Sequence, residues 1–230
     1  MIKALLLDFN GVVIDDEPIQ MEAYREILVD EGIELTEEKY LACLGMNDAV
    51  FLKTIYEREN KTVSDDRLSE LIDAKTAKWK ENIEKNTPLF DGVGDFIRRM
   101  ANDFTLGLVS MARRVEIDHV LEKTGLKDSF AIVVSAECVS TVKPDPECYR
   151  EGFRLVDFYR TSLGKAPLTH RQCVVIEDSP PGISAGRSAG LMALGVTNTV
   201  DDKQLRAAGA QAVTDSLKDW SPDSFRRVFV

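Results

Sequence analysis

The most constraining feature of this chain is a set of short, unbroken apolar runs, each followed directly by polar or glycine-rich residues. They occupy residues 2–9, 105–110, 131–135, 173–176 and 192–196. Unbroken runs, in place of alternation, indicate strands that are covered on both faces, as in parallel sheets. Helical patterns lie between them, at 115–124 before Gly125 and at 145–158. The alternation predicts a doubly wound α/β fold around a parallel sheet.

Residues 17–86 differ from the rest because no strand-like run occurs there and apolar residues recur at helical spacing. The helical candidates in this segment are 19–31, 36–43, 48–59 and 64–83. We therefore expect an α/β core of residues 1–16 and 87–230 with an inserted helical cap at 17–86. The linkers are predicted at 15–18 and 86–90, and a lid over a site at the strand ends is the natural use of such a cap. The alternative is that these helices pack on the sheet as part of one domain.

Composition and charge exclude several classes of partner. The 230 residues are 44% hydrophobic and 30% charged, which is enough apolar content for a compact core. A formal net charge of −10 repels nucleic acid and anionic membranes, so neither is an expected partner. Four scattered cysteines without CxxC spacing and two histidines argue against a zinc site. Free cysteines and the absence of a recognisable signal peptide predict a cytoplasmic protein.

Polar residues follow four of the predicted strands. They are Asp8, Ser110, Lys143 in a Lys-Pro loop, and the pair Glu177 and Asp178. Ligands of open α/β sheets gather at the carboxyl ends of the strands, so these side chains are expected in one crevice. Adjacent acids after a buried strand are costly unless a cation binds them, and Mg²⁺ is the cation that carboxylates favour.

Each of these residues also has a structural interpretation when it is taken alone. Asp8 could cap a turn, Ser110 could cap a helix, and Lys143 could be a solvated surface lysine. Glu177 and Asp178 could cap the helix that begins near Pro181. Their order along the chain is what favours a shared site over four separate structural roles.

The same residues carry a resemblance to the haloacid dehalogenase superfamily, close to its beta-phosphoglucomutase-like phosphatase branch. The matching motifs are Asp8-Phe9-Asn10-Gly11-Val12, Ser110, Lys143-Pro144, and Glu177-Asp178-Ser179 with Gly182. The resemblance implies a Rossmann-like core with a helical cap and a Mg²⁺-dependent phosphatase that acts on a small phosphorylated metabolite. It implies no other cofactor.

The resemblance also implies a role for each matching residue. The catalytic residues would be Asp8, Asn10, Ser110 and Lys143, with Asp8 as the nucleophile that forms an aspartyl-phosphate. The magnesium ligands would be Asp8, the backbone carbonyl of Asn10, Glu177 and Asp178. The residues that bind the substrate would be Gly11, Ser110, Met111, Arg113 and Lys143.

Asn10 departs from the family pattern, because this position usually carries an aspartic acid that protonates the leaving group and later activates water. An amide transfers no proton, and loss of a general acid–base typically costs about 10²–10⁴ in rate. Three interpretations follow: a phosphatase with slow turnover or a recruited acid such as Asp16, a phospho-ligand-binding relative, or an engineered substitution. A hinge aspartate such as Asp16 is more often the N-cap of the following helix.

Other branches of the family fit less well. Dehalogenases resembling this fold carry a bulky aromatic residue where this chain has Asn10, and phosphonatases carry alanine there. A sugar-phosphate mutase is the second candidate, but segment 44–48 lacks the arginine that grips a second phosphate, and Asp48 would repel it. The sequence does not identify the substrate, and a monomer is the simplest expectation.

Overall fold

A six-stranded parallel sheet forms the centre of the structure, a computed structural model that describes residues 1–85 and 87–229. The strands are β1 (Ala4–Leu7), β2 (Thr105–Val109), β3 (Ile132–Val134), β4 (Cys173–Glu177), β5 (Met192–Val196) and β6 (Ala212–Thr214). Their order, β3-β2-β1-β4-β5-β6, is that of the doubly wound Rossmann arrangement, so the predicted fold class is confirmed. From β1 the chain adds β2 and β3 on one side and then β4, β5 and β6 on the other, so the strand order switches between β1 and β4. Such sheets bind ligands at this switch point.

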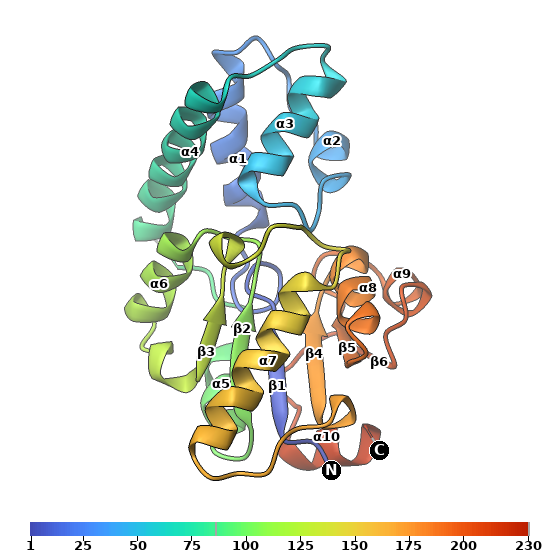
Figure 1. Ribbon diagram of the computed structural model, residues 1–230. Helices are drawn as coiled ribbons and strands as arrows, with labels where there is room; N and C mark the ends of the chain where they lie inside the picture. The colour runs from blue at the N-terminus through green and yellow to red at the C-terminus, as the bar shows by residue number, and fades with distance from the viewer. Residues whose placement is uncertain (86, 230) are drawn as a thin grey trace.

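Helices cover both faces of the sheet (Figure 1). They are α5 (Val93–Ala101), α6 (Arg114–Lys123), α7 (Glu147–Ser162), α8 (Pro180–Ser188), α9 (Asp202–Ala207) and α10 (Pro222–Val228). Successive residues of β1 point to opposite faces: Leu5 joins the cluster under α5, α6 and α10, whereas Leu6 packs under α7 and α8. Because both faces are covered, every residue of β1, β2 and β4 is buried.

Four further helices stand beyond the carboxyl ends of the strands (Figure 1). They are α1 (Glu17–Val29), α2 (Glu37–Leu41), α3 (Asp48–Arg58) and α4 (Asp65–Lys85). They share an apolar cluster in which the rings of Tyr24 and Phe51 stack 4.0 Å apart. Trp79 and Ile83, near the end of α4, instead join the cluster under the sheet. The helices therefore have a core of their own and are anchored to the sheet at one end.

The predicted and observed elements differ mostly at their ends. β1 is shorter than the predicted 2–9, and Asn86, the first residue of the second predicted linker, lies outside the described residues, as does Val230. Four elements have no counterpart among those predicted from the sequence: β6, α5, α9 and α10. β6 has three half-buried residues and α9 has six residues, so neither forms the long apolar run or periodic stretch by which the other elements were recognised.

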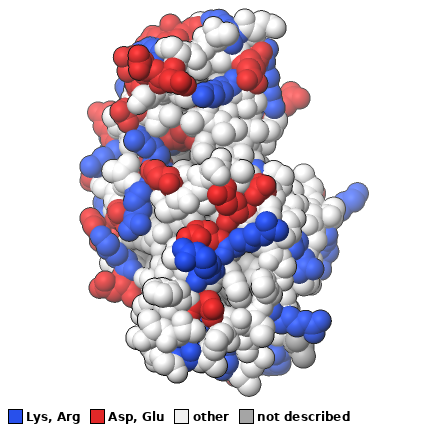
Figure 2. Space-filling view, viewed as in Figure 1, with Lys and Arg blue, Asp and Glu red and all other residues white. Residues whose placement is uncertain are grey.

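Charged side chains of both signs are interspersed over the face shown in Figure 2. The net charge of −10 therefore arises from a modest excess of acids and not from one acidic patch on this face. Among the described residues, no helix combines the length and the apolar character needed to cross a membrane.

The contact between α7 and β2 gives a test of the packing. A Cβ atom on Gly152 would lie 2.7 Å from Cγ2 of Val109 and 3.4 Å from Cδ1 of Leu6. We expect Gly152→Ala to lower the free energy of unfolding by roughly 1–3 kcal/mol, the usual cost of overpacking a core. Urea unfolding measures it, with Arg150→Ala on the exposed side of α7 as the control, expected within about 0.5 kcal/mol of wild type. Equal stabilities for the two variants would contradict the packing.

Candidate active site

The side chains that follow β1 and β4 meet around one buried lysine. Nζ of Lys143 lies 2.9 Å from Oδ2 of Asp8 and 2.5 Å from Oε1 of Glu177. It also lies over the ring of Tyr149, 5.2 Å from the ring centre. Burial by itself lowers the pKa of the Lys143 ammonium, but the charges of Asp8 and Glu177 raise it well above its usual value. Lys143 is therefore a permanent positive charge at the carboxyl edge of the sheet.

Glu177 is fully buried, and protein donors occupy both of its carboxylate oxygens. Oε1 accepts hydrogen bonds from Lys143 and from the Tyr149 hydroxyl at 2.7 Å. Oε2 accepts from the Ser179 hydroxyl at 3.0 Å and from the backbone N–H of Asp178 at 3.2 Å. This close fit requires Gly182, because a Cβ atom there would lie 1.9 Å from the Glu177 carboxyl carbon. Glu177 is thus placed to hold Lys143.

Asp8, Glu177 and Asp178 form an acidic cluster whose ligand atoms lie within 4.8 Å of one another. Oδ1 of Asp8 is buried and has no hydrogen-bond partner among the described residues. Burial, together with the charge of Glu177, raises the pKa of Asp8 to about 7 despite Lys143. Burial, then Glu177 and Asp8, raises the pKa of Asp178 well above its ordinary value. Three carboxyl groups share one ammonium, and the raised pKa values of Asp8 and Asp178 reflect this excess of acids, so the residues present fit a divalent cation.

Gly11 makes room for this cluster. Its backbone has φ of +74°, and a Cβ atom would lie 1.9 Å from Oδ2 of Asp178. The Asn198 amide donates to the Gly11 carbonyl at 2.8 Å, and the Thr199 hydroxyl donates to Asp178. The loop after β5 therefore supports the first motif, a contribution that the sequence analysis did not assign.

The Ser110 hydroxyl lies on the other side of Asp8, at the end of β2. Its oxygen accepts from the backbone N–H of Ala112 at 3.1 Å, and it donates to the Asn10 side-chain oxygen at 3.4 Å. Met111 is buried and lines the same cavity as Asp8 and Ser110. Arg113 is not among the lining residues, because its guanidinium is bonded to Asp73 at 2.9 Å and to Thr76 at 3.0 Å on α4.

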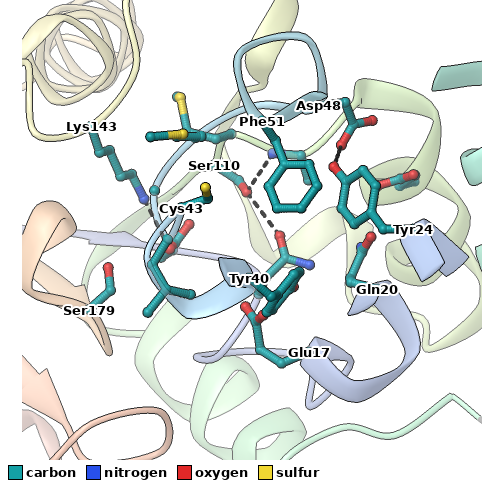
Figure 3. Close-up of a pocket in the computed structure, with 18 of the residues that line it drawn as sticks. Glu17, Gln20, Tyr24, Tyr40, Cys43, Asp48, Phe51, Ser110, Lys143 and Ser179 are labelled. Carbon is teal, nitrogen blue, oxygen red and sulfur yellow. Dashed lines mark hydrogen bonds and ion pairs between the residues drawn. The ribbon is translucent and has the colours of Figure 1, made fainter. Parts of the chain in front are cut away.

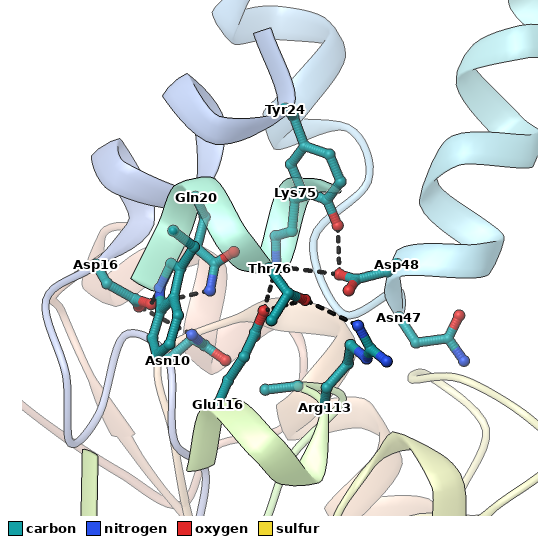
Figure 4. A network of polar contacts seen from close by, with 12 residues as sticks. Asn10, Asp16, Gln20, Tyr24, Asn47, Asp48, Lys75, Thr76, Arg113 and Glu116 are labelled. Atoms are coloured by element: carbon teal, nitrogen blue, oxygen red, sulfur yellow. Dashed lines mark hydrogen bonds and ion pairs between the residues drawn. The ribbon is translucent and has the colours of Figure 1, made fainter. Parts of the chain in front are cut away.

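The side chains of Asn10 and Asp16 are hydrogen-bonded to each other (Figure 4). The Asn10 amide donates to Oδ1 of Asp16 at 2.8 Å, while Oδ2 of Asp16 accepts from Gln20 at 2.9 Å and from the Trp79 indole at 2.7 Å. Asp16 occupies the N-cap position of α1 but makes no capping hydrogen bond. The pKa of Asp16 is raised overall, because burial raises it more than these three hydrogen bonds lower it.

The cavity between the sheet and α1–α4 has a volume of about 90 Å³ (Figure 3). Asp8, Asn10, Ser110, Lys143 and Asp178 line its sheet side. Its opposite side comprises residues that the sequence analysis did not single out: Glu17, Gln20, Tyr24, Tyr40, Lys75 and Glu116. Most lie within ordinary amphipathic helices, so only the folded arrangement brings them to the motifs.

Glu17 is one of the carboxyl groups on the far side with an oxygen that accepts no hydrogen bond, and Asp48 and Glu116 each have another. The Tyr40 hydroxyl donates to Oε2, and Oε1 accepts no hydrogen bond among the described residues. Burial raises the pKa of Glu17 to about 7, against the lowering effect of the Tyr40 hydrogen bond. A carboxyl group with this pKa in a catalytic cavity can both give and take a proton near neutral pH.

A buried ion network joins the helices above the sheet to α6 (Figure 4). Lys75 lies 3.3 Å from Asp48 and 3.1 Å from Glu116, and it is 1% exposed. The Tyr24 hydroxyl donates to Asp48 at 2.5 Å, and the Thr76 hydroxyl donates to Glu116 at 3.1 Å. Asp48, predicted to repel a second phosphate, therefore does line the cavity, but it lies beside a lysine.

Comparison with known proteins defines the class. Residues 5–196 match the family model of haloacid dehalogenase-like hydrolases, so the chain belongs to that family. Beta-phosphoglucomutase of Bacillus subtilis is 26% identical over 84% of this chain and 83% of its own length. The solved structure of a beta-phosphoglucomutase from Clostridium difficile has a TM-score of 0.85 and 23% identity, covering 100% of this chain and 97% of that chain. The predicted beta-phosphoglucomutase-like branch is confirmed.

Two further relatives have different names and lengths. The phosphorylated carbohydrates phosphatase of Thermotoga maritima is 27% identical over 92% of this chain and 93% of its own length. The chloroplastic protein SUPPRESSOR OF QUENCHING 1 of Arabidopsis thaliana is 26% identical over 94% of this chain, but the chain spans only 20% of that relative. The match with this chain thus extends over nearly the full length of the Thermotoga maritima phosphatase, but over only a fifth of the Arabidopsis thaliana protein.

The bond between Asn10 and Asp16 predicts a pH-dependent stability defect. Asn10→Asp places a second carboxylate against Asp16, and two carboxylates in contact share one proton, which raises the pKa of the pair. The variant should lose stability as pH rises from about 4 through that raised pKa, by roughly 2 kcal/mol between pH 5 and pH 8. Urea unfolding in EDTA at both pH values measures this loss. The double variant Asn10→Asp/Asp16→Asn should lack it, and the same pH dependence in both variants would contradict the pairing.

Proposed function

We propose that this protein is a Mg²⁺-dependent phosphatase that hydrolyses a small phosphorylated metabolite through an aspartyl-phosphate on Asp8. The observation that supports this most is the state of Asp8: one oxygen is bonded to a buried lysine, and the other is unpartnered at the cavity. The names of its relatives, which include a phosphorylated carbohydrates phosphatase, favour the same class of substrate. We place its action in the cytoplasm, as a monomer.

The proposed reaction proceeds by two displacements at phosphorus. Oδ1 of Asp8 attacks the phosphorus as the bond to the leaving oxygen breaks, which splits one difficult step into two easier ones. Water then attacks the phosphorus of the aspartyl-phosphate and releases phosphate with Asp8 regenerated. Lys143 holds the other oxygen of Asp8 and offsets negative charge as it develops. The Ser110 hydroxyl and the amide groups that follow it bind the phosphoryl oxygens.

Asp8, Asp178 and the Asn10 backbone carbonyl would hold the magnesium ion, together with Glu177, directly or through water. The ion would neutralise the carboxylate cluster and the incoming phosphoryl group. Gly11 keeps Asp178 close to Asp8, and Lys143 keeps the Asp8 carboxylate oriented before substrate binds.

Proton transfer needs a group other than Asn10. Asp16 was the first candidate, but its two oxygens accept three hydrogen bonds and it is not among the residues that line the cavity. Glu17 lines the cavity and has a free oxygen. In this mechanism Glu17 gives its proton to the leaving oxygen as the P–O bond breaks, and the resulting carboxylate takes a proton from the attacking water. Asp16 then serves to orient the Asn10 amide.

Helices α1–α4 act in this proposal as the cap predicted at 17–86, and they supply the far side of the cavity. A phosphomutase is the second candidate because a beta-phosphoglucomutase is among the relatives. A catalytically impaired relative that only binds a phosphorylated ligand is the third, since Asn10 replaces the usual acid. The presence of Glu17 in the cavity favours turnover over binding alone.

Metal removal and loss of the nucleophile test the core of the proposal. Hydrolysis of p-nitrophenyl phosphate, a substrate with a good leaving group, should require Mg²⁺ and fall at least about 100-fold in EDTA. Asp8→Asn should lower kcat at least about 10³-fold, because no second group can replace the nucleophile. Asp219→Asn, an exposed position, is the matched control. Hydrolysis that persists in EDTA would reject the mechanism.

Replacement of Glu17 tests proton transfer. The protonated carboxyl is present below its pKa of about 7 and is lost above it, so kcat/KM for an alkyl phosphate should fall as pH rises through about 7. The groups that act on Glu17 are Tyr40, Asp16, Lys75 and Asp15. Glu17→Gln should remove this pH dependence and lower kcat/KM by about 10²-fold, with a smaller loss on p-nitrophenyl phosphate. An unchanged pH profile in Glu17→Gln would assign the proton to another group.

A further inference from the structure

One wall of the cavity offers hydrogen-bond acceptors that no protein group fills. We call it the acceptor wall and define it as Gln20, Asp48, Lys75 and Glu116, which come from α1, α3, α4 and α6. Three of its side-chain atoms are buried without a partner among the described residues: Oε1 of Gln20, Oδ2 of Asp48 and Oε2 of Glu116. All three are acceptors.

Each donor nitrogen of the acceptor wall already makes at least one hydrogen bond to a protein acceptor. Nζ of Lys75 is bonded to Asp48 and Glu116 and faces the Tyr24 ring at 5.1 Å. The Gln20 amide nitrogen donates to Asp16, and the nearby Tyr24 hydroxyl donates to Asp48. A buried acceptor without a partner destabilises the protein, so this arrangement is best stabilised by a ligand that brings donors.

The charged groups of the acceptor wall also favour a ligand that brings hydrogen-bond donors. Asp48 and Glu116 are two carboxyl groups that share one cation, Lys75, so this buried region holds more acids than cations. A second phosphate placed here would face two carboxylates and find its one cation already paired. The two ends of the cavity therefore differ, since the sheet end has Lys143, Ser110 and a site that fits a divalent cation.

We infer that the acceptor wall binds the part of the substrate remote from its phosphate, and that this part carries hydrogen-bond donors and no second anion. Hydroxyl groups of a polyol and an ammonium group both have this chemistry. The inference rests on the proposed phosphatase function and narrows it to monophosphates with a donor-rich end. It also disfavours a phosphomutase that works through a sugar bisphosphate, because one phosphate of such an intermediate would occupy this wall.

A matched series of substrates tests the inference. The series consists of propyl phosphate, glycerol 3-phosphate, 3-aminopropyl phosphate and propane-1,3-diyl bisphosphate, with six-carbon counterparts, assayed with Mg²⁺. The hydroxylated or the aminated member should exceed the plain alkyl phosphate at least about tenfold in kcat/KM, and the bisphosphate should rank last. A higher kcat/KM for the hydroxylated substrate would indicate hydroxyl recognition, and a higher value for the aminated substrate would indicate ammonium recognition. An alkyl phosphate or a bisphosphate that ranks first would overturn the inference.

Isosteric variants link the preference to the acceptor wall. Glu116→Gln and Asp48→Asn keep the shape of each side chain but exchange an acceptor for a donor and remove a charge. Each should lower the ratio of kcat/KM for the preferred substrate to that for propyl phosphate by about tenfold, and reduce the discrimination against the bisphosphate. Glu81→Gln, exposed on α4, is the matched control. Circular dichroism checks that each variant is folded. If one of the two variants does not fold, the other still tests the inference.

The failures of the two proposals are distinguishable. If p-nitrophenyl phosphate is hydrolysed with Mg²⁺ and Asp8 but the matched series shows no preference, only the donor-binding inference fails. If no phosphomonoester is hydrolysed, the proposed function fails, and calorimetric binding of the same series still decides the subsite. Tighter binding of donor-rich phosphates by wild type than by Glu116→Gln would support it, and equal affinities across the series would overturn it.

Discussion

The charge balance around Lys143 is the constraint on which the site depends. Lys143 is 3% exposed, and its ammonium is held between Asp8 and Glu177, which come from neighbouring strands. Removing one partner of a buried ion pair typically costs about 3–5 kcal/mol, because the other charge is left uncompensated. The register of β1 against β4, which pairs Leu7 with Ile176, is therefore fixed both by packing and by this ion cluster. Asp8 is positioned before any substrate arrives.

The cavity has two ends with opposite hydrogen-bonding character. At the sheet end, an ammonium, a hydroxyl and a cluster that fits a divalent cation attract an anion. At the other end, the acceptor wall has unfilled acceptors and two carboxyl groups that share one lysine. A ligand that is anionic at one end and donor-rich at the other matches both, and this polarity would also fix its orientation relative to Asp8. The overall charge of −10 does not prevent the binding of an anion, because the local cations act at contact distance.

The sequence predicted the sheet and the motif residues because both depend on local signals. Unbroken apolar runs identified five strands, and the polar residues after them identified Asp8, Ser110, Lys143, Glu177 and Asp178. Lys75 and Glu116 were missed because a charged residue within an amphipathic helix normally lies on the solvated face. Their burial follows from how α4 packs against α6, which is a tertiary contact without a local signature. Gln20 was missed for the same reason.

The substitution at Asn10 is better understood together with its partner than alone. Asp16 lies at the start of α1, and Trp79 lies on α4, so the first and last of the four helices α1–α4 meet at one carboxylate. Asn10 joins the loop after β1 to that junction through its amide. A carboxylate at position 10 would compete with Asp16 for the Gln20 and Trp79 donors, whereas the Asn10 amide is itself a donor to Asp16. An ionised acid at position 10 would therefore destabilise this junction, whereas the carboxyl group of Glu17, on α1, faces the cavity.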